Sequence, residues 1–312
     1  MATVAPQVKF QSARATVASA GGAIELAYDV FGTSGIPLVL IMGIGAQRIF
    51  WEDAWCERLV DAGFQVVRYD HRDIGESSRL DDAGVPDPRA LLAKRLLGAT
   101  IAAPYTLSDM ATDTAGLIRA LGWGSAHVVG VSLGGMVAQH LGIEHPEVVR
   151  SLTTIMTTPG SRRFLPEPRA LRALFMPAPT TPEEAGRHAE ALFTTIGSQA
   201  WPVDGARLRA AGALAHTRGM SPKGFLRHFA AVLASGNRAS KLGTVTAPTL
   251  VIHGTRDPMF PLSAGRTLAG LVRHGTWLPM AGMGHDLPQP LWPVLVAAIR
   301  RHAGAAEARA TP

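Results

Sequence analysis

Short apolar runs separated by stretches of helical periodicity are the feature that most constrains the fold of this 312-residue chain. Runs that are apolar at nearly every position are typical of strands covered on both faces. Six such runs are predicted to be strands, at residues 37–42, 64–69, 126–131, 151–156, 248–254 and 276–280. Helices are predicted between or after them, at residues 51–62, 107–121, 133–145, 263–272 and 290–302. Because strands that alternate with helices form right-handed βαβ units, the sequence predicts an α/β fold: a mainly parallel sheet with helices on both faces.

A hairpin is predicted before the first of these runs. Two alternating segments, ATVAS and AIELAYDV, flank Gly21 and Gly22, and a glycine pair suits the positive φ angles of a tight turn. The hairpin and the six runs together predict a sheet of about eight strands.

The alternation stops between residues 159 and 240. This segment contains several helical patterns, many prolines and no convincing strand, and the strand pattern returns at residue 248. We therefore expect a core domain formed by residues 1–158 and 241–312, interrupted by a helical cap at 159–240. A chain of this length is consistent with one large domain that carries an insertion.

Composition and charge exclude several classes of function. The formal net charge is +6, but the basic residues are scattered and no run of five or more occurs, so no nucleic-acid partner is expected. The single cysteine, Cys56, excludes an intrachain disulfide and lies in a helical pattern typical of a structural thiol. No uncharged apolar stretch of 18 residues and no leader pattern occurs, so we expect a cytoplasmic protein without membrane contact. A homo-oligomer is left open.

One pentapeptide has the pattern of a nucleophile elbow. Residues 130–134 read Gly-Val-Ser-Leu-Gly, a G-x-S-x-G match that is weak by itself because glycine and serine are common. Its position between the predicted strand 126–131 and the predicted helix 133–145 is the one that the nucleophile elbow requires. The glycines let strand and helix approach closely, and the serine stands at the positive end of the helix. Ser132 is therefore the candidate nucleophile.

A serine hydroxyl needs a histidine base that is oriented by a carboxylate. His285 follows the last predicted strand in a glycine-rich loop, and Asp257 follows the strand at 248–254, which gives the chain order Ser, acid, His expected with a nucleophile elbow. His253, also at a strand end, is a less favoured base. The alternative place for the acid, segment 157–160 after the strand predicted at 151–156, contains no carboxylate.

Acyl transfer also requires N–H donors for the developing oxyanion. The first candidate is the backbone N–H of Leu133, directly after the nucleophile, and the second is that of Ile44 in the loop after the strand at 37–42. No cluster of cysteine or histidine residues has metal-ligand spacing, and we expect neither a metal nor a cofactor.

These motifs resemble the α/β-hydrolase superfamily, and within it the aclacinomycin methylesterase-like branch. The matching segments are LIMG (40–43), VRYDHRDIGES (67–77), HVVGVSLG (127–134), PTLVI (248–252) and GMGHDLP (282–288). The resemblance implies a serine esterase that forms an acyl-enzyme and acts on a small-molecule ester, which it does not specify. Arg72 and Asp73 are interpreted as a charged brace of the site rather than as catalytic groups.

Other functions are weighed against esterase activity. Cofactor-free haloperoxidases, which use carboxylic acids to make peracids, resemble the chain equally at the triad. Serine at position 132 disfavours dehalogenases and epoxide hydrolases, whose nucleophile is an aspartate. A peptidase, using Glu183, Glu184 or Glu190 to hold a substrate amine, and a non-catalytic receptor of the same fold are the less favoured hypotheses.

Overall fold

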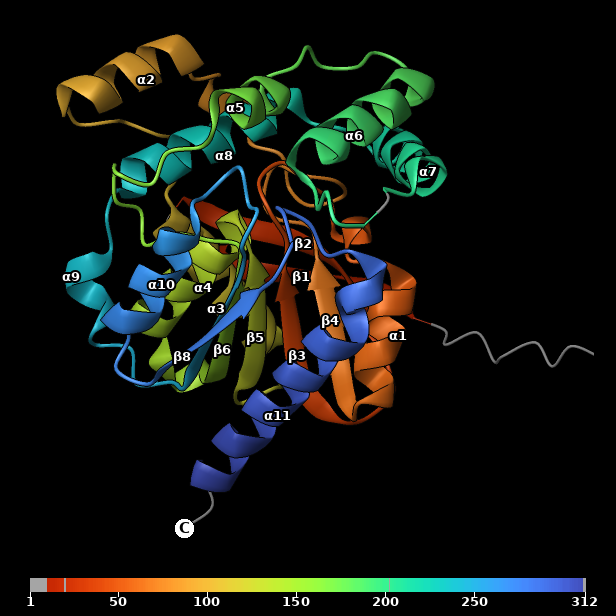
Figure 1. Ribbon diagram of the computed structural model, residues 1–312, viewed down its shortest axis with the longest axis vertical. Helices are drawn as coiled ribbons and strands as arrows, with labels where there is room; N and C mark the ends of the chain where they lie inside the picture. The colour runs from red at the N-terminus through yellow and green to blue at the C-terminus, as the bar shows by residue number, and fades with distance from the viewer. Residues whose placement is uncertain (1–9, 20, 202, 311–312) are drawn as a thin grey trace, which may run out of the picture.

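The computed structural model describes residues 10–19, 21–201 and 203–310, and it is built around one eight-stranded sheet (Figure 1). The strands are β1 (Gln11–Ser19), β2 (Gly22–Phe31), β3 (Ile36–Ile41), β4 (Phe64–Tyr69), β5 (Ala126–Val131), β6 (Val149–Ile155), β7 (Thr249–Gly254) and β8 (Gly275–Met280). They lie in the order β1-β2-β4-β3-β5-β6-β7-β8. The β1–β2 and β2–β4 pairs are antiparallel and all others are parallel, which confirms the predicted mainly parallel sheet of eight strands.

Two layers of helices cover the two faces of this sheet. Helices α3 (Leu107–Ala120), α4 (Leu133–Glu144) and α10 (Leu262–Leu271) pack on one face, and α1 (Asp53–Asp61) and α11 (Trp292–Ala310) pack on the other. Strand β3 shows why its sequence is continuously apolar. Val39 and Ile41 point into the first core, whereas Leu38 and Leu40 point into the second.

The described part of segment 159–240 contains helices and no strand. The helices are α5 (Pro168–Leu174), α6 (Pro182–Ile196), α7 (Gly205–Thr217), α8 (Pro222–Ser235) and the start of α9 (Ala239–Leu242). Figure 1 shows α5 to α8 gathered beyond one end of the sheet. The prolines of this segment do not interrupt helices: Pro168, Pro182 and Pro222 each occupy a first-turn position, where a missing N–H costs nothing.

One helix outside this segment, α2 (Pro88–Leu97), was not predicted from the sequence. Helix α2 lies between β4 and α3 in the chain and stands beside α8 (Figure 1). Leu91 of α2 packs with Phe229 and Ala230 of α8.

Across the residues that the structure describes, no helix is both long enough and apolar enough to cross a membrane.

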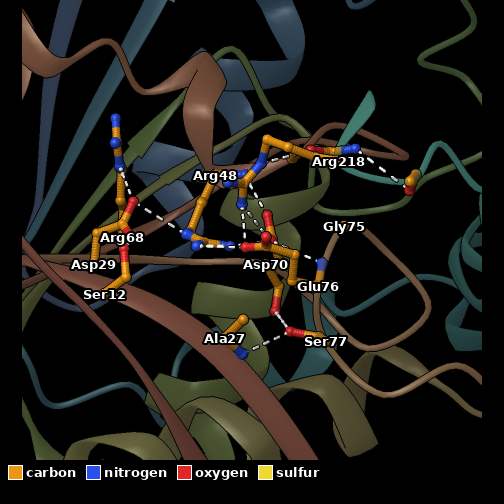
Figure 2. Close-up of polar contacts among 12 residues, drawn as sticks. Ser12, Ala27, Asp29, Arg48, Arg68, Asp70, Gly75, Glu76, Ser77 and Arg218 are labelled. Atoms are coloured by element: carbon orange, nitrogen blue, oxygen red, sulfur yellow. Dashed lines mark hydrogen bonds and ion pairs between the residues drawn. The ribbon is translucent and has the colours of Figure 1, made fainter. Parts of the chain in front are cut away.

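A buried network of charges joins the loop after β4 to the rest of the molecule (Figure 2). The Asp70 carboxylate accepts hydrogen bonds from the Arg48 backbone N–H (2.6 Å), from the Arg48 guanidinium and from the Glu76 N–H (3.1 Å). Arg48 is also 3.0 Å from Asp29 of β2. Arg218, at the end of α7, donates to Glu76 at 2.6 Å. An ion pair therefore links the helical segment 159–240 to the core at this loop.

Candidate active site

Ser132 occupies the sharp turn between β5 and α4. Its φ of 54° and ψ of −117° are strained values for a residue with a side chain. A Cβ atom added to Gly130 would lie 2.3 Å from the Gly134 carbonyl oxygen, and one added to Gly134 would lie 2.1 Å from the Ile41 oxygen. Both glycines are thus required by close backbone approach, as the G-x-S-x-G pattern predicted.

The structure brings the three predicted side chains together. Nε2 of His285 lies 3.0 Å from the Ser132 hydroxyl, and Nδ1 lies 2.9 Å from Oδ2 of Asp257. The other carboxylate oxygen of Asp257 accepts the N–H groups of Met259 (2.8 Å) and Phe260 (3.0 Å), which hold the carboxylate in place. Because Nδ1 faces a carboxylate, it carries the proton, and Nε2 is left to accept one from the serine.

The alternative base, His253, also lies beside the Asp257 carboxylate. It is fully buried, and its Nε2 is 3.0 Å from the Phe260 carbonyl oxygen and 3.4 Å from Oδ2 of Asp257. Burial lowers the pKa of His253, which keeps the ring neutral. The histidine that contacts the serine hydroxyl is therefore His285.

The loop after β3 runs beside the serine. A Cβ atom added to Gly43 would lie 3.6 Å from Cβ of Ser132. The next N–H groups have partners: that of Gly45 donates to His228 at 3.3 Å, and that of Ala46 donates to a carbonyl within the loop. In the described part of the chain, the N–H groups of Ile44 and Leu133 have no hydrogen-bond partner. Leu133 is the first residue of α4, where N–H groups are free and the helix dipole favours negative charge.

Residues of the insertion hold the loop that carries the histidine. The His285 N–H donates to the Ile196 carbonyl oxygen at 2.8 Å, and the Gly284 N–H donates to the Ser198 hydroxyl at 2.8 Å. The same hydroxyl donates to Asp286. These contacts were not predicted. In the sequence, the glycine at position 284 is the feature that fits these contacts. A Cβ there would lie 2.4 Å from the backbone after α6, so a larger residue would push the two segments apart.

Aromatic side chains of the insertion lie against the loop after β3. Phe225 sits over Gly45, where an added Cβ would be 2.7 Å from its ring. The Phe175 ring packs edge-on against Phe225 (5.7 Å between centroids) and Phe229 (4.9 Å). The sequence did not distinguish these residues from other apolar residues of the insertion.

The charged residues next to the site are paired with one another. Arg72 donates to both oxygens of Asp113 at 2.6 Å, and Asp73 accepts two hydrogen bonds from Arg227 of α8, at 2.7 and 2.8 Å. This pairing agrees with a bracing role. Cys56 is buried, and its burial raises the pKa of the thiol to about 12, which leaves it unreactive.

The acidic residues that a peptidase would use have partners on the insertion itself. Glu183 and Glu190 pair with Arg187 and Arg209, and Glu184 accepts two hydrogen bonds in the turn before α6. Within the described ranges, no group of three or more histidine, cysteine or acidic side chains is placed to hold a metal ion.

This strand order, with a strained serine after β5, defines a class of proteins. The alpha/beta hydrolase fold family matches residues 36–288, and the chain belongs to that family. It is 30% identical over 294 residues to rhodomycin D methylesterase of Streptomyces peucetius, covering 86% of this chain and 91% of that one. This similarity confirms the resemblance to the methylesterase-like branch.

Two further comparisons bear on fold and chemistry. A Mycobacterium tuberculosis protein that carries the name of a non-heme bromoperoxidase is 28% identical over 268 residues, covering 84% of this chain and 91% of the relative. An esterase structure from Thermogutta terrifontis superposes with a TM-score of 0.69 at 22% identity, covering 94% of this chain and 99% of the other. At that identity, the structural likeness supports the fold.

Proposed function

We propose that this hydrolase cleaves carboxylic esters of small molecules through an acyl-enzyme on Ser132. The observation that carries the proposal is the continuous contact from the Ser132 hydroxyl through His285 to Asp257, located at the strained turn between β5 and α4. The similarity to a methylesterase supports an ester as the substrate class.

The proposed reaction has two halves. Oγ of Ser132 attacks the ester carbonyl carbon while Nε2 of His285 takes the hydroxyl proton. The carbonyl oxygen becomes an oxyanion that the N–H groups of Ile44 and Leu133 stabilise. Collapse of this intermediate expels the alcohol, which receives the proton from His285. Water then attacks the acyl-enzyme with His285 again as base, and the acid leaves as Ser132 regains its proton.

Helices α5 to α8 act in this proposal as a cap that covers the site and shapes its pocket. The support is their place beyond one end of the sheet (Figure 1) and the contacts of Ile196, Ser198 and Phe225 with the two site loops. An apolar, aromatic surface next to the oxyanion loop favours esters with an apolar acyl or alcohol group.

Steady-state hydrolysis of p-nitrophenyl esters of graded chain length tests the proposal. Ser132→Ala should lower kcat by about 10⁶, the usual cost of losing a triad nucleophile. The matched control is Ser125→Ala, because Ser125 lies just before β5 and its half-buried hydroxyl only accepts a hydrogen bond from Nε of Arg150 at 3.0 Å. Equal activity of Ser132→Ala and wild type would contradict the proposal.

A perhydrolase is the second candidate, favoured by the relative named as a bromoperoxidase. In that reaction, hydrogen peroxide instead of water would attack the acyl-enzyme and release a peracid. Acetate- and peroxide-dependent bromination that exceeds ester hydrolysis under matched conditions would favour this candidate.

A further inference from the structure

Two buried histidines hold the loop after β3 at its two ends. Nε2 of His71 lies 3.0 Å from the Met42 carbonyl oxygen, and Nδ1 of His228 accepts the Gly45 N–H at 3.3 Å. The two rings contact each other edge to face, with centroids 5.5 Å apart and planes at 87°. His71 comes from the segment after β4, whereas His228 comes from α8, 183 residues beyond Gly45.

The hydrogen-bond partners define the protonation state of both rings. Nε2 of His71 faces the Met42 oxygen, and Nε2 of His228 faces the Arg72 carbonyl oxygen at 3.0 Å. Carbonyl oxygens only accept, so each ring carries its proton on Nε2. Nδ1 of His228 is therefore bare and able to accept the Gly45 N–H. Burial lowers the pKa of His71 to about 3 and that of His228 to about 4, so both rings are neutral near pH 7.

The Gly45 hydrogen bond has a consequence for the oxyanion donors. With its N–H committed to His228, the peptide between Ile44 and Gly45 has one orientation, and Gly45 adopts a φ of 66°. The Ile44 N–H, one peptide earlier in the same short loop, is left unpaired on the stretch that runs beside Ser132. Without the histidine acceptor, the half-buried Gly45 N–H would lack its partner in the protein, and nothing else would fix the orientation of this peptide.

We propose that His228 is a positioning residue for the oxyanion loop, acting from helix α8 through the Gly45 N–H to hold Ile44 in its donor orientation. The inference rests on the proposed function, because it concerns how the oxyanion is bound. It also makes α8 part of the catalytic arrangement, since the loop is correctly held only while α8 is docked on the core. The Arg227–Asp73 pair, one residue away on α8, provides that docking.

Two substitutions separate the positioning contact from the other roles of the ring. In His228→Asn, the amide oxygen occupies the place of Nδ1 and can still accept the Gly45 N–H. In His228→Gln, the longer amide reaches the place of Nε2 and can donate to the Arg72 oxygen, but the Gly45 N–H loses its acceptor. Both variants lose the ring and its packing against His71, so their thermal stabilities should be similar.

We expect His228→Gln to lower kcat by about 10- to 100-fold with KM changed less than about 3-fold, because a misaligned oxyanion donor weakens binding of the transition state only. His228→Asn should retain kcat within about 5-fold of wild type. Equal kcat values in two folded variants would overturn the inference.

A measurement on the wild type keeps the inference testable if either variant fails to fold. Amide hydrogen exchange resolved at Gly45 should show protection of at least about 100-fold, whereas exchange at the rate of an unprotected loop would overturn the contact. A wild type that hydrolyses no ester would overturn the proposed function, and Gly45 exchange would still decide whether His228 holds the loop.

Discussion

The Asp73→Asn substitution would break the ion pair that docks α8 on the core. Both side chains of the Asp73–Arg227 pair are fully buried, and Arg227 donates from Nε and Nη2 to the two carboxylate oxygens at 2.8 and 2.7 Å. Burial alone would raise the pKa of Asp73, but the hydrogen bonds from Arg227 and from the Leu80 N–H outweigh it and lower the pKa. Asp73 is therefore ionised at neutral pH, and its negative charge neutralises the buried guanidinium of Arg227.

The expected cost follows from this burial. Removing one member of a buried ion pair costs about 3–5 kcal/mol, because the remaining charge is left in a poorly solvated place. The lower end applies here, since the asparagine oxygen can still accept one hydrogen bond and the exposed Asp81 lies 3.6 Å from Arg227. Asparagine also tolerates the left-handed backbone at position 73, where φ is 71°, so the change tests charge rather than strain. We expect a loss of about 3 kcal/mol, or roughly 5 °C in Tm for a chain of 312 residues.

The assay is urea unfolding at pH 7 followed by circular dichroism, with Tm from calorimetry. Glu183→Gln is the matched control, because it removes a carboxylate from the exposed Glu183–Arg187 pair on α6 and should leave Tm unchanged within about 1 °C. An Asp73→Asn protein as stable as the control would refute the argument that this pair anchors α8.

Three further outcomes are expected. Asp257→Asn should lower kcat by about 10⁴ while the circular dichroism spectrum stays that of the wild type, because His285 loses its orientation; a change below 10-fold would contradict the proposed role. Gly134→Ala should destabilise the fold by at least about 3 kcal/mol in urea unfolding, since the added Cβ would lie 2.1 Å from a carbonyl oxygen, and a variant of wild-type stability would contradict this. His71 and His228 stay neutral in the folded state but gain protons in the unfolded state below about pH 6.5, so the protein loses stability as pH falls. Together they should lower the free energy of unfolding by about 4 kcal/mol between pH 7 and pH 5. A free energy of unfolding that does not change over this pH range would contradict their lowered pKa values.

The core and the triad positions could be predicted because their signals are local. Each strand of the parallel sheet is apolar on both faces, as Leu38 and Val39 show by packing into opposite cores. The carboxyl ends of parallel strands meet at one edge, so residues placed just after β5, β7 and β8 were expected to converge, and Ser132, Asp257 and His285 do.

Contacts of the insertion with the core could not be predicted, because they join segments that are distant in sequence. His228 and Gly45 are 183 residues apart, and Ser198 and Gly284 are 86 apart. Nothing in the pattern of either partner specifies the other. Helix α2 was missed for a different reason: its Leu96 and Leu97 are more than four-fifths exposed, so its apolar residues do not mark a single buried face.

Covalent labelling of Ser132 tests the central claim most directly. The wild type is treated with a fluorophosphonate, digested with trypsin and sequenced by tandem mass spectrometry. The account predicts a single adduct in the peptide of residues 120–150, on Ser132 and not on Ser125, which is the other serine of that peptide. Labelling should appear in step with loss of esterase activity. Full loss of activity with the adduct on any other residue, or retained activity with Ser132 fully labelled, would contradict the account.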